Sequence, residues 1–224
     1  FPTDPSPIFH RFGLDPEKHR IILHPHRPEP GKGLLETIQV VEILVRDFGI
    51  EGIRVLVPQW LELMNGEAES EFHRLITAEL SRRGLTENFI FHDWLSQSDM
   101  AAYYSAGEVT LCLGNMVEAF GNVAYESLVC GTPSIAARVG VHRSQLPDEL
   151  IDKVDYGDAR AAAAAAAQIL MKRSRVEGKR LERIREAFSL SRQLQSYARI
   201  ISEAKKRKPP ISERSMLVKS CLRR

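Results

Sequence analysis

The chain has 224 residues, of which 43% are hydrophobic and 27% charged, with a formal net charge of +2. This length and apolar content can bury one good core, which predicts a single α/β domain or slightly more. A run of about eighteen consecutive apolar residues, as a membrane-spanning helix requires, does not occur. The three cysteines are odd in number and suit small buried side chains in a reducing cytoplasm better than a disulfide framework.

The first segment that suggests chemistry is a strand, a loop and a helix near the N-terminus. Residues 20–25 predict a strand, and the apolar residues within 34–45 follow the helical period. Arg27 and Lys32 lie on the turn between them. A rigid Arg fork and a mobile Lys charge beside a helix N-terminus suit a diphosphate and can stabilise charge on a leaving group. A solvated turn often has the same Pro- and Gly-rich composition, so this segment alone leaves both interpretations open.

A second strand–loop–helix unit follows, with acidic residues in place of basic ones. Residues 109–113 and 134–137 predict strands, and the helix between them spans residues 122–130, ending at Gly131. In such units ligands bind at the carboxyl ends of the strands, where a helix N-terminus offers free N–H groups to a phosphate.

Two carboxylates flank the start of this helix. Glu118 precedes it, Glu126 lies about one turn inside it, and Gly121 lets the backbone approach a ligand closely. Carboxylates accept hydrogen bonds from hydroxyls, so the pair can bracket a polyhydroxylated ligand. Considered alone, the pair also has a purely structural explanation, in which Glu118 favours the helix N-terminus and Glu126 is solvated.

Together the two segments resemble the donor-binding C-terminal domain of GT-B glycosyltransferases, specifically the family 4 (group 1) retaining enzymes. That family carries Arg-x4-Lys-Gly after the first strand of this domain, and Glu-x7-Glu followed by Cys-Gly-Thr-Pro. Arg27 to Gly33 and Glu118 to Pro133 match both motifs in order and spacing. The resemblance covers about residues 8–200, including a strand and a tyrosine-containing helix within residues 83–106. It implies an α/β fold, a Rossmann-like parallel sheet sandwiched by helices.

The resemblance implies a role for each matching residue. Arg27 and Lys32 would hold the departing diphosphate, while Glu118 would contact the transferred sugar. Glu126 would contact the ribose hydroxyls. The backbone groups expected to cradle the sugar and phosphates belong to Phe120, Gly121, Asn122 and Val123. The residues expected beside the nucleobase are Asp93, Trp94 and Leu95.

The implied activity is transfer of a sugar, with retained anomeric configuration, from a UDP-, GDP- or ADP-sugar to an acceptor hydroxyl. No metal is expected, because two cations would carry the diphosphate charge, and His24 and His26 have no obvious third ligand nearby. No nucleic-acid partner is expected. The rival interpretation is a non-catalytic Rossmann-like module that binds a nucleotide or a partner. A nicotinamide-dependent enzyme is disfavoured, because no Gly-x-Gly-x-x-Gly follows the first strand.

Three departures from the family pattern affect the donor site. His26 replaces the Gly that usually precedes this Arg, so the resemblance does not define the shape of the phosphate loop. Pro58-Gln59-Trp60 stands where a Gly-x-Gly turn is usual, and Gly140-Val-His142 stands where a double Gly is common. The base and sugar preferences of the family therefore do not transfer to this chain.

The domain organisation follows from the same resemblance. Residues 1–17 are predicted to form the linker that enters the domain, residues 18–201 the nucleotide-sugar-binding domain, and residues 202–224 a basic tail. A GT-B enzyme has two domains that face each other across a cleft. The N-terminal, acceptor-binding domain would be missing, so we expect the chain alone to transfer little.

The last quarter of the sequence predicts helices and a charged end. Residues 159–171 predict a helix by propensity, and residues 173–200 continue as charged amphipathic helix. Its expected packing positions, part of which should form an exposed apolar stripe without the partner domain, are Leu181, Ile184, Phe188, Leu194, Tyr197 and Ile200. Residues 202–224 hold eight basic and two acidic residues. They suit a solvated end or a peripheral contact with anionic lipid. The expected location is the cytoplasm, including the inner face of a membrane.

Overall fold

The computed structural model describes residues 2–66, 69–115, 121–144 and 147–204. The chain divides into two compact units, one ending at Ile184 and the other beginning at Arg185. The first unit contains the sheet and the site described below. The described part of the second unit is helical.

The first unit is built on a six-stranded sheet in which each neighbouring pair is parallel. The spatial order is β3-β2-β1-β4-β5-β6. The strands are β1 (Arg20–Leu23), β2 (Ile53–Pro58), β3 (Phe89–His92), β4 (Val109–Cys112), β5 (Ser134–Ala137) and β6 (Asp152–Val154). Parallel strands need crossovers, which are normally helical and cover both faces of the sheet. The near-continuous apolar strands, β4 and β5 above all, follow from this burial on both sides.

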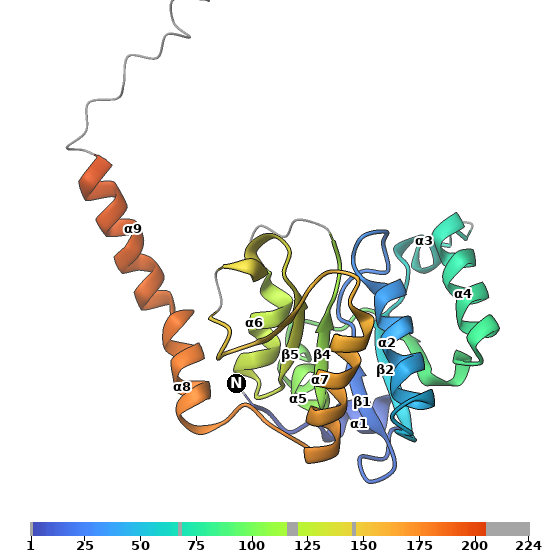
Figure 1. Ribbon diagram of the computed structural model, residues 1–224. Coiled ribbons are helices and arrows are strands. Elements are labelled where there is room, and N and C mark those ends of the chain that lie inside the picture. The colour runs from blue at the N-terminus through green and yellow to red at the C-terminus, as the bar shows by residue number, and fades with distance from the viewer. Residues whose placement is uncertain (1, 67–68, 116–120, 145–146, 205–224) are drawn as a thin grey trace, which may run out of the picture. The chain divides into compact units, whose positions relative to one another are not determined.

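Helices cover the two faces separately. The first layer holds α2 (Leu34–Arg46), α4 (Glu71–Arg83) and α7 (Ala159–Lys172). Figure 1 shows α2 and α7 side by side, and these two helices share the most extensive helix–helix contact in the described chain. The second layer holds α1 (Ser6–Arg11), α5 (Met100–Ala106) and α6 (Asn122–Val129). This arrangement confirms the predicted Rossmann-like sheet sandwiched by helices.

Alternation along β1 shows how the sheet fills both layers. Ile22 joins the core cluster beneath α2 and α7. Ile21 and Leu23 point to the other face and join the cluster that contains α1 and α5. Successive side chains of a strand face opposite sides, so three consecutive apolar residues serve two separate cores. Their exposed fractions are 1% or less, which makes β1 a fully buried central strand.

Short elements complete the first unit. They are α3 (Leu61–Met64) and the 3₁₀ helices η1 (Thr86–Asn88) and η2 (Gly140–Arg143). Residues 6–11, inside the predicted linker, form α1, whose Ile8 is buried against the α5 layer. Cys112 and Cys130 are both buried, as expected, and burial raises the pKa of the Cys130 thiol.

The C-terminal helices are α8 (Gly178–Ala187) and α9 (Leu190–Ala204). Leu181 and Ile184 of α8 are buried, as their spacing predicts. On α9, by contrast, the large apolar side chains are exposed: Leu190, Leu194, Tyr197, Ile200 and Ile201. The predicted exposed stripe is therefore present on α9. Among the described helices, none is both long and apolar enough to cross a membrane.

Candidate functional site

The centre of the sheet is the point where the chain reverses its direction of travel. β1 and β4 are neighbours, and the chain leaves β1 toward β2 and β4 toward β5, on opposite sides. In parallel sheets, such a switch point is where a crevice at the carboxyl ends of the strands binds ligands. The basic loop, residues 24–33, follows β1 at this point, and residues 113–115 follow β4.

The two loops touch through their backbones. Asn115 donates a hydrogen bond from its N–H to the carbonyl of Gly31, at 3.0 Å. A Cβ placed on Gly33 would lie 2.5 Å from the nitrogen of Gly114, and Gly33 also has a φ of +91° at the start of α2. Real Cβ atoms do not approach backbone so closely, so only glycine fits here. The glycine of the Lys-Gly pair thus lets the basic loop pack against the loop after β4.

Arg27 lies over an aromatic ring. Its guanidinium carbon is 5.1 Å from the centre of the Trp94 ring, and its Nη1 is 3.9 Å from a carboxylate oxygen of Glu29. Trp94 is itself held, because its indole N–H donates to the carbonyl of Gln59 at 3.3 Å. Cation–π contacts of this kind contribute about 0.5–1 kcal/mol at exposed sites. Arg27 therefore has a preferred position, although its side chain is 55% exposed.

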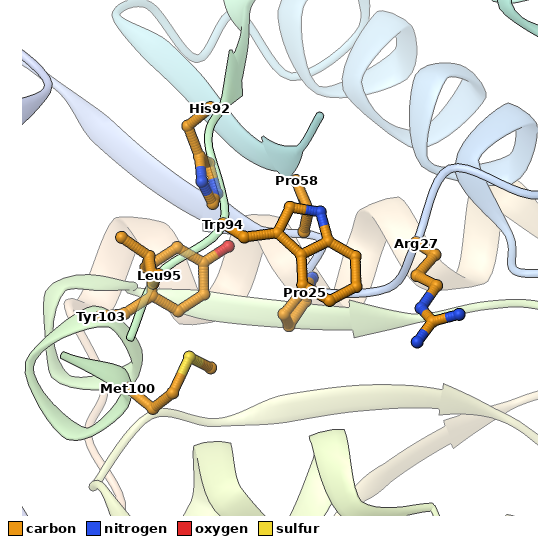
Figure 2. Close-up of a pocket in the computed structure, with 8 residues that line it drawn as sticks. All are labelled: Pro25, Arg27, Pro58, His92, Trp94, Leu95, Met100 and Tyr103. Atoms are coloured by element: carbon orange, nitrogen blue, oxygen red, sulfur yellow. The ribbon is translucent and has the colours of Figure 1, made fainter. Parts of the chain in front are cut away.

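A cavity of about 260 Å³ opens beside this contact. Figure 2 shows its lining, in which Trp94 lies centrally, with Arg27 at one end and Tyr103 and Met100 at the other. The lining residues come from the ends of β1, β2 and β3 and from α5: Pro25, Arg27, Pro58, His92, Trp94, Leu95, Met100 and Tyr103. The lining is mainly apolar, with few polar groups, a combination typical of small-molecule sites.

Two buried histidines lie near the carboxyl ends of β1 and β3. His92 donates from Nδ1 to the carbonyl of Asp93 at 2.8 Å, and burial lowers its pKa. His24 lies 3.0 Å from the Thr37 hydroxyl through Nδ1, and burial, with the neighbouring His26, holds its pKa well below the usual value. Both rings are therefore neutral near pH 7. Within the described ranges, no three His, Cys, Asp or Glu side chains gather as a metal site would require.

The start of α6 is shaped by the segment after β5. Gly121 precedes the helix with a φ of +71°, and a Cβ on it would lie 2.6 Å from Nε2 of His142 and 2.9 Å from Val141. His142 is 5% exposed and belongs to η2. The first N–H groups of α6 lack partners within the helix, as at every helix start, and they face the crevice end of the sheet. His142 thus leaves no room for a side chain at Gly121.

Glu126 is exposed on α6, yet one of its oxygens is bound. The Tyr104 hydroxyl donates to Oε2 of Glu126 at 2.8 Å. Tyr104 is 1% exposed, and burial, together with the Glu126 charge, raises its pKa far above the usual range. The hydroxyl therefore stays protonated and donates to Glu126 at neutral pH.

The structure brings some of the predicted site residues together and separates others. Arg27, Trp94 and Leu95 line one cavity. Asp93 is exposed and does not line it, although its carbonyl holds His92. Gly121, Asn122 and Val123 begin α6, and Lys32 lies on the loop that contacts Gly114. Glu118 and Phe120 lie outside the described residues.

Sequence reasoning missed several lining residues. His92 ends β3 and Pro25 lies two residues after β1, so their place near the carboxyl edge of the sheet was a usable signal. Met100 and Tyr103 lie on α5, and only the packing of α5 beside β3 brings them to the cavity. Trp94 is 41% exposed and is therefore not a core residue.

Known structures share this architecture. Sucrose-phosphate synthase from Thermosynechococcus elongatus superposes with a TM-score of 0.71 at 24% identity, covering 91% of this chain and 50% of that one. Anabaena HepE, in complex with UDP and glucose, gives 0.74 at 16% identity, covering 91% and 53%. The C-terminal domain of a group 1 glycosyl transferase, LpcC, from Francisella tularensis gives 0.59 at 17% identity, covering 76% and 86%. At these identities the likeness concerns the fold.

Sequence comparison adds the family. D-inositol 3-phosphate glycosyltransferase from Kribbella flavida (strain DSM 17836 / JCM 10339 / NBRC 14399) is 34% identical over 108 residues, which are 45% of this chain and 24% of that protein. The chain thus matches only part of its curated relative and about half of the first two structures. The model of the family described as glycosyl transferases group 1 matches residues 6–189. The chain belongs to the group 1 glycosyl transferases.

Proposed function

We propose that this chain binds a nucleotide-diphosphate sugar and is the donor-binding domain of a retaining glycosyltransferase. The observation that carries the proposal is the backbone contact between the basic loop after β1 and the loop after β4, at Gly33 and Gly114. This contact places the loop that carries Arg27 and Lys32 beside the loop after β4, which leads toward the second motif. Family membership supports the same chemistry.

The proposed roles follow the positions of the side chains. Arg27 and Lys32 stabilise the charge that grows on the diphosphate as its bond to the sugar breaks. The first N–H groups of α6, after Gly121, face a phosphate or sugar oxygen. Glu126 accepts hydrogen bonds from ribose hydroxyls, and Glu118 contacts the transferred sugar. Two cations suffice for the leaving diphosphate, so we propose that transfer needs no metal.

The nucleobase occupies the cavity beside Trp94 in this proposal. The cavity is mainly apolar, and its indole wall offers a flat face to an aromatic ring. HepE has been solved with UDP and with UDP-glucose, which makes UDP the first ligand to test. Pro58, which stands where the family usually has a glycine turn, lines the same cavity, so we propose that it affects which nucleobase fits there.

The acceptor hydroxyl attacks on the face from which the diphosphate leaves, so the anomeric configuration is kept. The sugar–oxygen bond to the diphosphate breaks with its electron pair, and the acceptor proton passes to the departing phosphate oxygen. We propose that a second, N-terminal domain binds the acceptor, because the chain covers about half of its structural relatives. Catalysis by the whole protein therefore requires both halves.

The location of the enzyme is also part of the proposal. We place it in the cytoplasm, with residues 202–224 available for electrostatic contact with anionic lipid at a membrane. Co-sedimentation with vesicles that contain anionic lipid, with and without the tail, tests this point. Equal sedimentation of both forms would remove the membrane from the proposal.

Calorimetry with UDP, GDP, ADP and their glucose conjugates tests donor binding by the 224-residue chain. We expect one nucleotide series to bind, and little sugar transfer, because the acceptor is proposed to bind a second domain. Fusion to an acceptor domain of a close relative should restore transfer, and Glu118→Ala should lower it by about a hundredfold. Transfer that is equal for wild type and Glu118→Ala would leave the non-catalytic module as the better interpretation.

A further inference from the structure

Glu126 is attached to a buried tyrosine of the neighbouring helix. The 2.8 Å hydrogen bond from the Tyr104 hydroxyl occupies Oε2 of an otherwise exposed carboxylate. A solvated glutamate has several rotamers, whereas this bond selects those that point toward α5. The second oxygen of the carboxylate then has a restricted orientation as well.

The protein fixes Tyr104 from the other end too. Thr132, of the Cys-Gly-Thr-Pro motif, lies with its hydroxyl 2.6 Å from the carbonyl of Tyr104. The N–H of Thr132 donates to the carbonyl of Ser127, on α6, at 3.0 Å. The motif thus ties the end of α6 to the residue that holds Glu126. Tyr104 and Glu126 are therefore fixed relative to each other both through backbone and through side chains.

We propose that Tyr104 is a positioning residue, which holds the Glu126 carboxylate so that its other oxygen accepts the ribose hydroxyls of the donor nucleotide. This inference rests on the role proposed above for Glu126. A flexible side chain that becomes immobilised on binding costs about 0.5–1.5 kcal/mol of binding free energy. Ordering it beforehand removes this cost, which corresponds to roughly a threefold to tenfold gain in affinity. The gain applies only to ligands that carry ribose hydroxyls.

The test compares a ribonucleotide with its 2′,3′-dideoxy form, using whichever of UDP, GDP and ADP the wild-type chain binds. The ratio of the two dissociation constants measures recognition of the hydroxyls alone. We expect a ratio of roughly ten for the wild type, since hydrogen bonds to a charged group are among the stronger ones. Tyr104→Phe should lower this ratio about threefold to fivefold and leave binding of the dideoxy form unchanged.

Two variants control for a merely structural effect. Tyr156→Phe removes a hydrogen bond of the same kind and length, from the Tyr156 hydroxyl to the carboxylate of Glu36 rather than Glu126, at 2.8 Å. Ser134→Ala removes a buried hydroxyl that donates to the carbonyl of Ala124 on α6, at 3.3 Å. Both can lower the melting temperature, but neither should change the ratio. Replacing Tyr104 with 4-aminophenylalanine, which keeps a donor at the same place, should restore it.

The outcomes separate this proposal from the one beneath it. A wild-type chain that binds none of the three nucleotides, or that does not distinguish the dideoxy form, overturns the role of Glu126 and this inference with it. A wild-type chain that discriminates while Tyr104→Phe discriminates equally overturns the positioning role alone. If Tyr104→Phe does not fold, the same ratio is measured for Glu126→Asp. This variant keeps the negative charge, but its shorter side chain moves the carboxylate away from Tyr104. Full discrimination by that variant overturns the proposal.

Discussion

At the scale of single residues, Trp94 links the basic loop to the cavity. It lies under the Arg27 guanidinium and also lines the space proposed for the base. We expect Trp94→Leu to weaken nucleotide-diphosphate binding by about threefold to tenfold, because it removes a cation–π contact of about 0.5–1 kcal/mol and a flat face for the base. Calorimetry with the preferred nucleotide measures this. Phe48→Leu, at an aromatic residue that is similarly exposed at 39%, should bind like the wild type; a Trp94→Leu protein with wild-type affinity would contradict the role of Trp94.

Gly121 gives a second prediction at this scale. Gly121→Ala forces a Cβ into His142 and Val141 and also strains a φ of +71°. Gly157→Ala has a similar strain, at a φ of +84°, but open space around the new Cβ. The left-handed strain costs about 1–2 kcal/mol in both proteins. We therefore expect Gly121→Ala to lose more unfolding free energy than Gly157→Ala in urea titrations, and to lose nucleotide binding that Gly157→Ala retains.

His142 provides the check on that explanation. If the clash causes the additional loss, the double variant Gly121→Ala with His142→Ala should lose less unfolding free energy than the sum of the losses of the two single variants. Strict additivity would show that the two side chains do not collide.

At the scale of elements, the loops after β1 and β4 form the site as a pair. Gly114→Ala would press a Cβ against the carbonyl of Gly31 and the backbone of Lys32. We expect the basic loop to shift away from the crevice, with nucleotide binding weakened by about tenfold or more, because displaced cations meet the diphosphate poorly. Calorimetry tests this. Gly84→Ala, at the open C-terminal end of α4, has the same left-handed strain, at a φ of +68°, and should lower stability while leaving the affinity unchanged.

Most elements could be predicted from sequence because their patterns are local. The helices at 34–45, 122–130 and 159–171 differ from α2, α6 and α7 by one residue at an end. The tyrosine-containing helix expected within residues 83–106 is α5, which begins at Met100, after a loop of residues 95–99. In that loop the carboxylate of Asp99 accepts the N–H of Ser96 at 3.3 Å, a local bond that competes with helix.

At the scale of the whole molecule, the buried neutral histidines make stability depend on pH. Burial holds the pKa of His24 and of His92 below the usual value of about 6.5. As the pH falls through that value, the unfolded chain takes up protons that the folded chain refuses, so the folded state loses stability. We expect the unfolding free energy to fall below pH 6.5 by up to about 1.4 kcal/mol per pH unit for each such histidine.

Urea titrations between pH 7.5 and 5.5, where most carboxylates stay ionised, measure this slope. His24→Gln removes one titrating ring and should make the slope shallower, even if the variant is less stable at every pH. An unchanged slope would show that His24 is not among the groups responsible.

The sequence alone determined the order of the two motifs and the spacing of residues 27, 32, 118 and 126. It also predicted the β-α-β units, because spacing and periodicity are properties of the chain itself. The sequence also indicated the family, because two separated motifs match the family pattern in order and spacing. The cavity, the Arg27–Trp94 contact, the meeting of Gly33 with Gly114, and the Tyr104–Glu126 bond were decided only by tertiary structure. Each of these contacts joins residues that lie in different parts of the chain. The distance between such residues depends on the order of the parallel strands and on how the helices pack on the two faces of the sheet. No local sequence pattern specifies either.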